Sequence, residues 1–149
     1  MLDIEIRLMH IGDYDAVYAL WLSCKGMGLN DVDDSREGLD RYLRRNSSTC
    51  FVALCDGKIV GVIMAGHDGR RGYIHHTAVL EAYRGCGVGK RLVGRALDAL
   101  KEEGISKVAL VVFDRNDTGN VFWEKQGFTT REDLIYRNKT LVPMVRKDT

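Results

Sequence analysis

The feature that most constrains the fold of this chain is a glycine-spaced loop, residues 83–90 (YRGCGVGK), between two stretches of different hydrophobic periodicity. Residues 73–79 before the loop are typical of a β-strand. After it, apolar residues recur at helical spacing from residue 88 to residue 100, and Gly104 marks the end of the helix. A strand that leads directly into an amphipathic helix requires a sheet on which that helix can pack, so the chain is predicted to be an α/β protein.

The residues before the loop predict further strands and two helices. Residues 4–8 alternate between apolar and charged, which indicates a strand, and helical spacing follows from residue 13 to residue 22. Asp34 and Glu37 are spaced for a capping box at the start of a second, short helix. Residues 50–54 and 58–65 are strand-like runs separated by Asp56-Gly57, a strong hairpin signal. With residues 73–79 they predict an antiparallel meander of three strands.

The residues after the long helix predict the rest of the sheet. Residues 108–113 form a continuous apolar run, typical of a strand in a sheet that is covered on both faces. Residues 118–125 predict a short helix closed by Gly127, and residues 128–142 predict two last strands around a turn at 131–133. The expected fold class is therefore α/β with a mixed, mostly antiparallel central sheet flanked by helices.

Size and composition exclude several classes of protein. A chain of 149 residues with 45% hydrophobic content is expected to form one domain, residues 1–149. Its formal net charge of +1 gives no reason to expect binding to nucleic acid. The four cysteines show no CxxC pair, so we expect neither a metal site nor disulfides. The first residues are polar, and no run of 18 apolar residues occurs, so we expect a cytoplasmic protein without a membrane span.

The glycine-spaced loop is suited to binding an anion. Successive N–H groups at a helix N-terminus point toward one place, and together with the helix dipole they favour a phosphate group. Arg84 and Lys90 would add positive charge. A Rossmann fingerprint needs glycine where Lys90 stands, and a Walker loop needs glycine at Arg84 and Ser or Thr at Arg91. Both of these phosphate loops are therefore excluded.

Two motifs resemble those of the GCN5-related N-acetyltransferase (GNAT) family. Arg84-x-x-Gly87-x-Gly89 matches the family signature Q/R-x-x-G-x-G/A, and residues 116–128 (NDTGNVFWEKQGF) resemble its later helix, which starts near an Asn and ends in Gly-Phe. The resemblance extends over nearly the whole chain. It implies an acetyl-CoA-dependent N-acetyltransferase that uses no metal.

The resemblance also implies where acetyl-CoA binds. In the family, the fourth and fifth strands of the sheet splay apart and admit the pantetheine arm, backbone groups near Val79 bond its amides, and the glycine loop holds the pyrophosphate. The later helix lines the other side. The residues implied in binding the cosubstrate are Ala78, Val79, Arg84, Gly85, Cys86, Gly87, Val88, Gly89, Lys90, Asn116 and Trp123.

Acetyl transfer to an amine requires a group that accepts a proton near neutral pH, and histidine is the natural candidate. Strand alternation predicts that Tyr73 and His75 share one face of their strand and that His76 points to the other. Some members of the family carry their base at positions that match Tyr73 or His75. We therefore expect His75 to be the base, directly or through water, with Glu81 as a lesser candidate.

Trp123 departs from the family pattern, because many members have at this place a Tyr proposed to protonate the departing thiolate. An indole N–H donates a hydrogen bond but is not a useful acid. Thiolate departure would then depend on solvent, on hydrogen bonding by the indole, or on another residue such as Tyr73 or Tyr136. Packing against the cosubstrate or the core is the role that we favour for Trp123.

The acceptor amine stays open at the level of sequence. A small polyamine or amino acid, an aminoglycoside, a lysine side chain and a protein N-terminus are all compatible, and an acidic run at residues 31–40 could attract a cationic amine or simply be solvated. The resemblance also allows a homodimer. The alternative to an active enzyme is an acetyl-CoA-binding module of the same fold whose catalysis is weak or lost, and a purely structural domain would bind no CoA.

Overall fold

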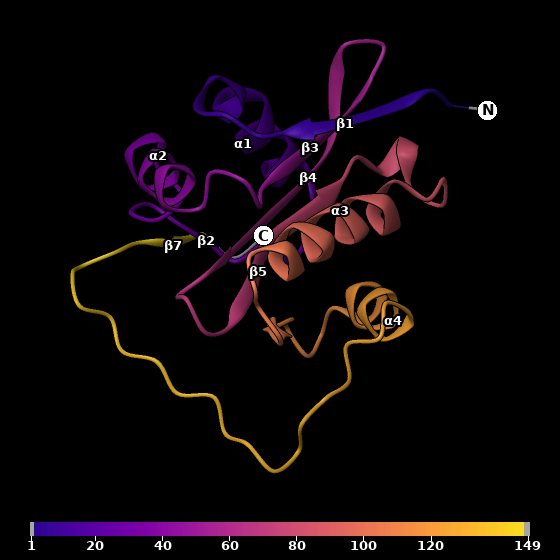
Figure 1. Cartoon of the computed structure of the whole chain (residues 1–149). Coiled ribbons are helices and arrows are strands. Elements are labelled where there is room, and N and C mark those ends of the chain that lie inside the picture. The colour runs from indigo at the N-terminus through magenta and orange to yellow at the C-terminus, as the bar shows by residue number, and fades with distance from the viewer. Residues whose placement is uncertain (1, 148–149) are drawn as a thin grey trace.

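A five-stranded sheet forms the centre of the computed structural model, which describes residues 2–147 (Figure 1). The strand order is β1-β3-β4-β5-β6. Neighbouring strands are antiparallel except for β5 and β6, which are parallel. The bounds of the strands are Ile4–Leu8 (β1), Phe51–Cys55 (β3), Lys58–His67 (β4), Gly72–Val79 (β5) and Val108–Ala109 (β6).

Helices cover both faces of the sheet. Helix α3 (Val88–Glu102) packs on one face through the buried residues that its sequence spaces along one side, such as Leu92 and Ala96. Helices α1 (Tyr14–Ser23) and α2 (Arg36–Arg45) pack on the other face around Trp21 and Leu39. Full burial of a large apolar side chain contributes roughly 1.5–3 kcal/mol, so these two layers supply most of the stabilisation. Helix α4 (Asp117–Lys125) follows β6.

The predicted fold class is confirmed. The predicted order of elements holds as far as α4, except that a short strand that was not predicted, β2 (Leu29–Asn30), lies between α1 and α2. The hairpin at Asp56-Gly57 and the long helix after the glycine loop both form where the sequence places them. Two short 3-10 turns, Ile11–Asp13 and Glu81–Tyr83, precede α1 and α3.

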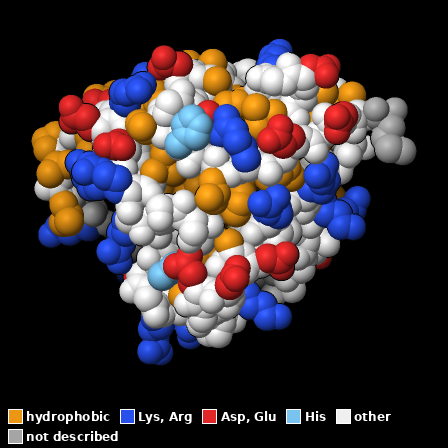
Figure 2. All heavy atoms as spheres, turned by 45° about the horizontal axis from the view of Figure 1, so that its top comes forward, with side chains coloured by type: hydrophobic (Ala, Val, Ile, Leu, Met, Phe, Trp, Pro, Cys, Tyr) orange, Lys and Arg blue, Asp and Glu red, His pale blue; other side chains and the backbone are white. Residues whose placement is uncertain are grey.

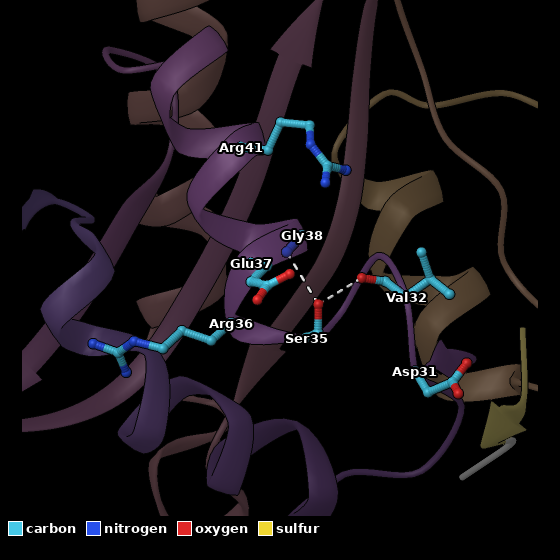
Figure 3. A pocket seen from close by; sticks show the side chains of 7 residues that line it. All are labelled: Asp31, Val32, Ser35, Arg36, Glu37, Gly38 and Arg41. Carbon is cyan, nitrogen blue, oxygen red and sulfur yellow. Dashed lines mark hydrogen bonds between the residues drawn. The ribbon is translucent and has the colours of Figure 1, made fainter.

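The predicted capping box at Asp34 is wrong, because Ser35 is the N-cap of α2. The Ser35 hydroxyl accepts a hydrogen bond from the Gly38 amide at 3.0 Å and donates one to the Val32 carbonyl at 2.7 Å (Figure 3). The Asp34 carboxylate is used elsewhere: it accepts from the Asn30 amide at 2.8 Å and lies 2.7 Å from the His76 ring. Because the cap lies at Ser35, one residue after the predicted position, the Asp34 carboxylate is available for a tertiary contact.

The predicted strand over residues 108–113 is wrong beyond Ala109. β6 pairs with β5 only at Gly72–Val108 and Tyr73–Ala109, after which the chain diverges. Val111 is 58% exposed, so this run is not covered on both faces as its continuous apolar character suggested. The apolar residues that follow Ala109 line an opening in the sheet instead.

The two predicted strands in residues 128–142 are also absent from the described chain. This segment leaves α4, makes a wide excursion (the yellow trace in Figure 1) and returns as β7 (Arg146–Lys147), which pairs with β2 (Leu29–Asn30). Because β6 is only two residues long, it offers no extended edge on which further strands could pair. Ile135 is 78% exposed in this segment.

The surface carries charges of both signs. Figure 2 shows basic and acidic side chains interspersed over the face that it displays, with apolar side chains between them. Among residues 2–147, no helix is long and apolar enough to cross a membrane.

Candidate active site

The divergence of β5 from the chain after β6 opens a large cleft, with a volume of about 1960 Å³. The residues of β5 from Tyr73 to Val79 line one wall, and residues 110–113 line the wall opposite. The glycine loop and the start of α3 lie at one part of the cleft, and residues of α2 lie at another. The sheet therefore presents a slot wide enough for an elongated ligand, with an anion-binding motif in its lining.

The glycine loop has the backbone geometry that its sequence predicts. Gly85 and Gly87 have φ values of +76° and +83°, a left-handed conformation that residues with a Cβ rarely adopt. A Cβ added to either would meet no described heavy atom within 4 Å, so the space beside them is open. Gly87 is the N-cap of α3, and in the described chain no side chain caps this end and no acidic residue occupies its first turn. The helix N-terminus is left available to an anion.

Gly89 has a different role from the other two glycines. A Cβ at this position would lie 3.1 Å from the ring of Phe122, which is tighter than ordinary van der Waals contact. The missing side chain lets the first turn of α3 lie against α4. Gly89 thus fixes the distance between two elements that line the cleft.

Arg84 is bound within the protein. Its Nε donates to the Val79 carbonyl at 3.0 Å, and one terminal nitrogen lies 3.4 Å from the Cys24 sulfur. The side chain therefore ties the glycine loop to the end of β5 and to the residue that follows α1. This leaves Lys90, exposed in the first turn of α3, as the cation beside the helix N-terminus.

Asn116 and Trp123 both line the cleft from the side of α4. The Asn116 side chain caps α4 by accepting from the Gly119 amide at 2.9 Å. The indole of Trp123 packs edge-on against Phe122 at 5.0 Å and Phe128 at 5.2 Å between ring centroids. Trp123 lines the cleft as part of an aromatic cluster, in agreement with a packing role.

Tyr73 and His75 lie together on β5, as strand alternation predicts. Their ring centroids are 4.6 Å apart, and Tyr42 of α2 contacts the His75 ring edge-on at 5.6 Å. His75 is exposed toward the cleft, and partial desolvation by the protein beside it, with a smaller contribution from His76, lowers its pKa to about 4. Burial raises the pKa of Tyr73. Glu81, in the 3-10 turn after β5, is exposed.

His76 does not point to the opposite face, so that prediction is wrong. Met64 pairs with His75 and Val62 with Ala78, which leaves two residues of β5 opposite one of β4, a β-bulge. The φ of His76 is +30°. The bulge turns the imidazole to the face covered by α1 and α2, where its ring lies 5.0 Å from that of Trp21.

Sequence reasoning missed the contact between Asp34 and His76. Asp34 Oδ1 lies 2.7 Å from His76 Nε2, and both residues line the cleft. The periodicity of the sequence contains no signal for the bulge, because a bulge inserts one residue without changing residue types. The sequence does show two consecutive histidines, both of which could face the site. Strand alternation alone does not determine which of them does.

Two features together define a class of acetyltransferases. The sheet opens between two parallel strands, and an uncapped, glycine-rich helix start lies in the opening. Comparisons with known proteins indicate the same class. The model of the Acetyltransferase (GNAT) family matches residues 14–128. An acetyltransferase of Pectobacterium atrosepticum is 33% identical over 138 residues, 93% of this chain and 96% of that protein. One of Sodalis glossinidius is 30% identical, with the same coverage of both chains. The chain belongs to the GNAT acetyltransferase family.

Solved structures share the fold. The PaiA N-acetyltransferase of Thermoplasma acidophilum, in complex with coenzyme A, superposes with a TM-score of 0.75 and 22% identity over 88% of this chain and 92% of that one. The aminoglycoside acetyltransferase AAC(6')-Iy, in complex with a bisubstrate analogue, gives a TM-score of 0.72 and 19% identity over 93% and 99%. The protein is thus a transferase of the GNAT type.

Proposed function

We propose that the protein uses acetyl-CoA to acetylate a primary amine, by direct attack of the amine on the thioester in a ternary complex. The observation that carries the proposal is the uncapped N-terminus of α3, with left-handed Gly85 and Gly87, set in the cleft where β5 and β6 diverge. A ligand with a pyrophosphate and a long flexible arm fits both features. The coenzyme A complex of the structural neighbour supports the same ligand.

The residues of this chain would hold acetyl-CoA as follows. The amides at the start of α3, assisted by Lys90, bind the pyrophosphate. The arm lies along β5 near Ala78 and Val79, with Asn116 and Trp123 on the opposite side. The Val79 carbonyl already accepts a hydrogen bond from Arg84. When the pantetheine arm binds, this carbonyl must therefore either share that hydrogen bond or exchange it for one to the arm.

Proton transfer is expected at the part of β5 that faces α2. His75 and Tyr73 are the residues that the sequence favours there. With a pKa of about 4, the imidazole of His75 is neutral at pH 7. A ring that is protonated only in acid is a weak base, so we assign His75 to hydrogen bonding with the acceptor or with water.

Calorimetric titration with acetyl-CoA tests the proposal. We expect the wild-type protein to bind acetyl-CoA and to bind S-acetylpantetheine, which lacks the pyrophosphate, far more weakly. Gly87→Asp should weaken acetyl-CoA binding by roughly 100-fold or more, because its carboxylate repels the pyrophosphate and its Cβ strains a left-handed backbone.

Gly94→Asp is the matched control, because it adds the same charge to an open position on the same helix. It should leave the affinity within about twofold of wild type. Equal affinities in Gly87→Asp and wild type would contradict the assignment of the loop.

A second function rests on Trp123. If its indole leaves the thiolate without a proton donor, the protein would bind acetyl-CoA but turn over weakly. Detection of free thiol with a panel of primary amines separates the two: release with any amine supports the enzyme, and binding without release supports the binding module.

A further inference from the structure

We propose that His76, held by Asp34, is the group that takes the proton from the acceptor amine. This inference rests on the proposed function and names a catalytic pair for it. His75, the histidine favoured by strand alternation, then has a positioning role.

Asp34 is built into the protein around this contact. The residue is 3% exposed, and its carboxylate has two partners, the Asn30 amide at 2.8 Å and His76 Nε2 at 2.7 Å. Its backbone carbonyl accepts from the Tyr14 hydroxyl at 2.7 Å, which anchors the segment to α1. A buried carboxylate fixed on both sides can orient an imidazole firmly.

The backbone of β5 is also shaped to present His76. The residue has a positive φ, uncommon for a residue with a side chain, and sits in a bulge of the strand that lines the cleft. The indole N–H of Trp21 donates to the His76 carbonyl at 3.2 Å and stabilises the bulged conformation. Strained backbone of this kind is retained where it directs a side chain toward a site.

The pair fixes which ring nitrogen can act. With Asp34 ionised, the neutral imidazole carries its hydrogen on Nε2 and donates it to the carboxylate. Nδ1 then carries the lone pair that can accept a proton. The side chain of His76 is 16% exposed, enough to be reached from the cleft that it lines.

The reaction balances with these groups. The amine nitrogen forms a bond to the thioester carbon, a proton passes from that nitrogen to His76 Nδ1, and the carbon–sulfur bond breaks to release CoA thiolate. The proton on Nδ1 then returns to the thiolate or to solvent, and the imidazole is neutral again. No other reactant is needed.

The charges around the ring favour this assignment over His75. Asp34 faces His76 from the segment before α2, His75 lies beside it on β5 at 6.2 Å, and neutral Trp21 faces it from α1. Asp33, on the same segment as Asp34, also lines the cleft. An imidazolium at His76 would pair with a buried carboxylate, whereas the ring contacts of His75 are with the neutral rings of Tyr42 and Tyr73.

Three variants of the full-length protein test the pair. His76→Gln removes the proton acceptor but can still donate a hydrogen bond to Asp34, Asp34→Asn keeps the shape and removes the charge, and His75→Gln compares the adjacent histidine. His10→Gln, at an exposed histidine that does not line the cleft, is the matched control. For each, acetyl-CoA affinity is measured by calorimetry. Turnover is measured as thiol release from acetyl-CoA, from pH 6 to 9, with spermidine, L-lysine, glucosamine and ethanolamine.

We expect His76→Gln to lower kcat by about 100-fold or more, the usual contribution of a general base, with acetyl-CoA affinity unchanged. Asp34→Asn should lower kcat by about 10-fold or more, and His75→Gln should lower it by clearly less than His76→Gln does. The control His10→Gln should leave kcat within about twofold of wild type. Retained kcat in His76→Gln, or an equal loss in His75→Gln, would overturn the assignment while the proposed function stands. Wild-type protein that binds acetyl-CoA but releases no thiol with any amine would overturn both.

A measurement on the wild-type chain tests the pair even if the variants do not fold. Nitrogen-15 NMR of the histidine rings should find neutral His76 protonated at Nε2. A ring protonated at Nδ1 would exclude the pair as drawn, because the lone pair would then face Asp34.

Discussion

At the scale of single residues, two adjacent histidines show how environment sets chemistry. His75 contacts Tyr73 and Tyr42 and has a pKa lowered to about 4, mainly by desolvation. His76, one residue later, has a buried carboxylate at 2.7 Å. In the mechanism that we propose, the same side chain is therefore a neutral hydrogen-bonding group in one position and half of an acid–base pair in the next.

The lowered pKa of His75 predicts a pH dependence of stability. Unfolded histidine takes up a proton near pH 6.5, whereas folded His75 does so only near pH 4. Between these values the unfolded state binds more protons, so the free energy of unfolding should fall as the pH is lowered through this window. Denaturant titrations at pH 7, 6, 5 and 4 should show a larger loss for wild type than for His75→Gln. Parallel losses would mean that His75 is not desolvated.

The structure leaves no space for a side chain at Gly66 of β4. A Cβ there would lie 2.5 Å from the Tyr42 hydroxyl and 2.6 Å from Asn46 Cγ, so α2 would have to move. Gly66→Ala should lower the free energy of unfolding by about 1–3 kcal/mol. In the control Gly94→Ala, the added methyl meets open space in a helix and should stabilise by about 0.5–1 kcal/mol. A neutral Gly66→Ala in urea titration would show that α2 is free to adjust.

At the scale of elements, α2 begins where it does because Ser35 caps it. The cap satisfies the Gly38 amide and leaves Asp34, the preceding residue, outside the helix with its carboxylate turned to β5. Figure 3 shows Arg36 and Arg41 extending to opposite sides of this helix start. The start of α2 is thereby linked to the geometry of the cleft.

Loss of this cap has a measurable cost. Ser35→Ala should lower the free energy of unfolding by about 1 kcal/mol, the typical contribution of a serine N-cap. Ser47→Ala, at an exposed position after the same helix, serves as the control and should change stability by less than about 0.5 kcal/mol. Urea titration of the two variants beside wild type measures the difference. Equal stabilities would mean that another group replaces the serine hydroxyl.

At the scale of the whole molecule, the sheet ends early and the C-terminal segment stays outside it. Residues 128–145 run as an exposed, irregular segment, and only β7 returns to pair with β2 (Figure 1). Val145 is tied to Asp31 by two hydrogen bonds, from the Asp31 amide at 3.1 Å and to its carboxylate at 2.6 Å. The end of this segment is thus fixed to the loop before α2 by backbone and side-chain hydrogen bonds at Asp31.

This arrangement predicts where a protease cuts first. Trypsin should cleave after Arg137 and Lys139, which are exposed and outside any helix or strand, before it cleaves after Arg95 or Lys101 in α3. Mass spectrometry of brief digests identifies the cleavage sites. Protection of Arg137 and Lys139 would mean that the segment is folded against another surface in solution, such as a second copy of the chain.

Periodicity and turn chemistry by themselves determined most of the fold. The hairpin at Asp56-Gly57, the amphipathic α3 and the glycine loop that starts it follow from short-range rules: positive φ at glycine, apolar spacing and helix ends. The anion site that we propose could be predicted for the same reason, because its groups are backbone amides within one loop. The resemblance to the GNAT family added the splayed strands, which the structure confirms.

Only the tertiary structure decided which side chains meet in the cleft. Asp34 and His76 are 42 residues apart, and their contact depends on a bulge and on a cap at Ser35 that local patterns did not distinguish from a cap at Asp34. The early end of β6 and the excursion of residues 128–145 likewise depend on whether the sheet has an edge strand long enough for further pairing. Local rules fix conformation along the chain, whereas the contacts between side chains in the cleft arise between elements, where the packing of the whole molecule decides the outcome.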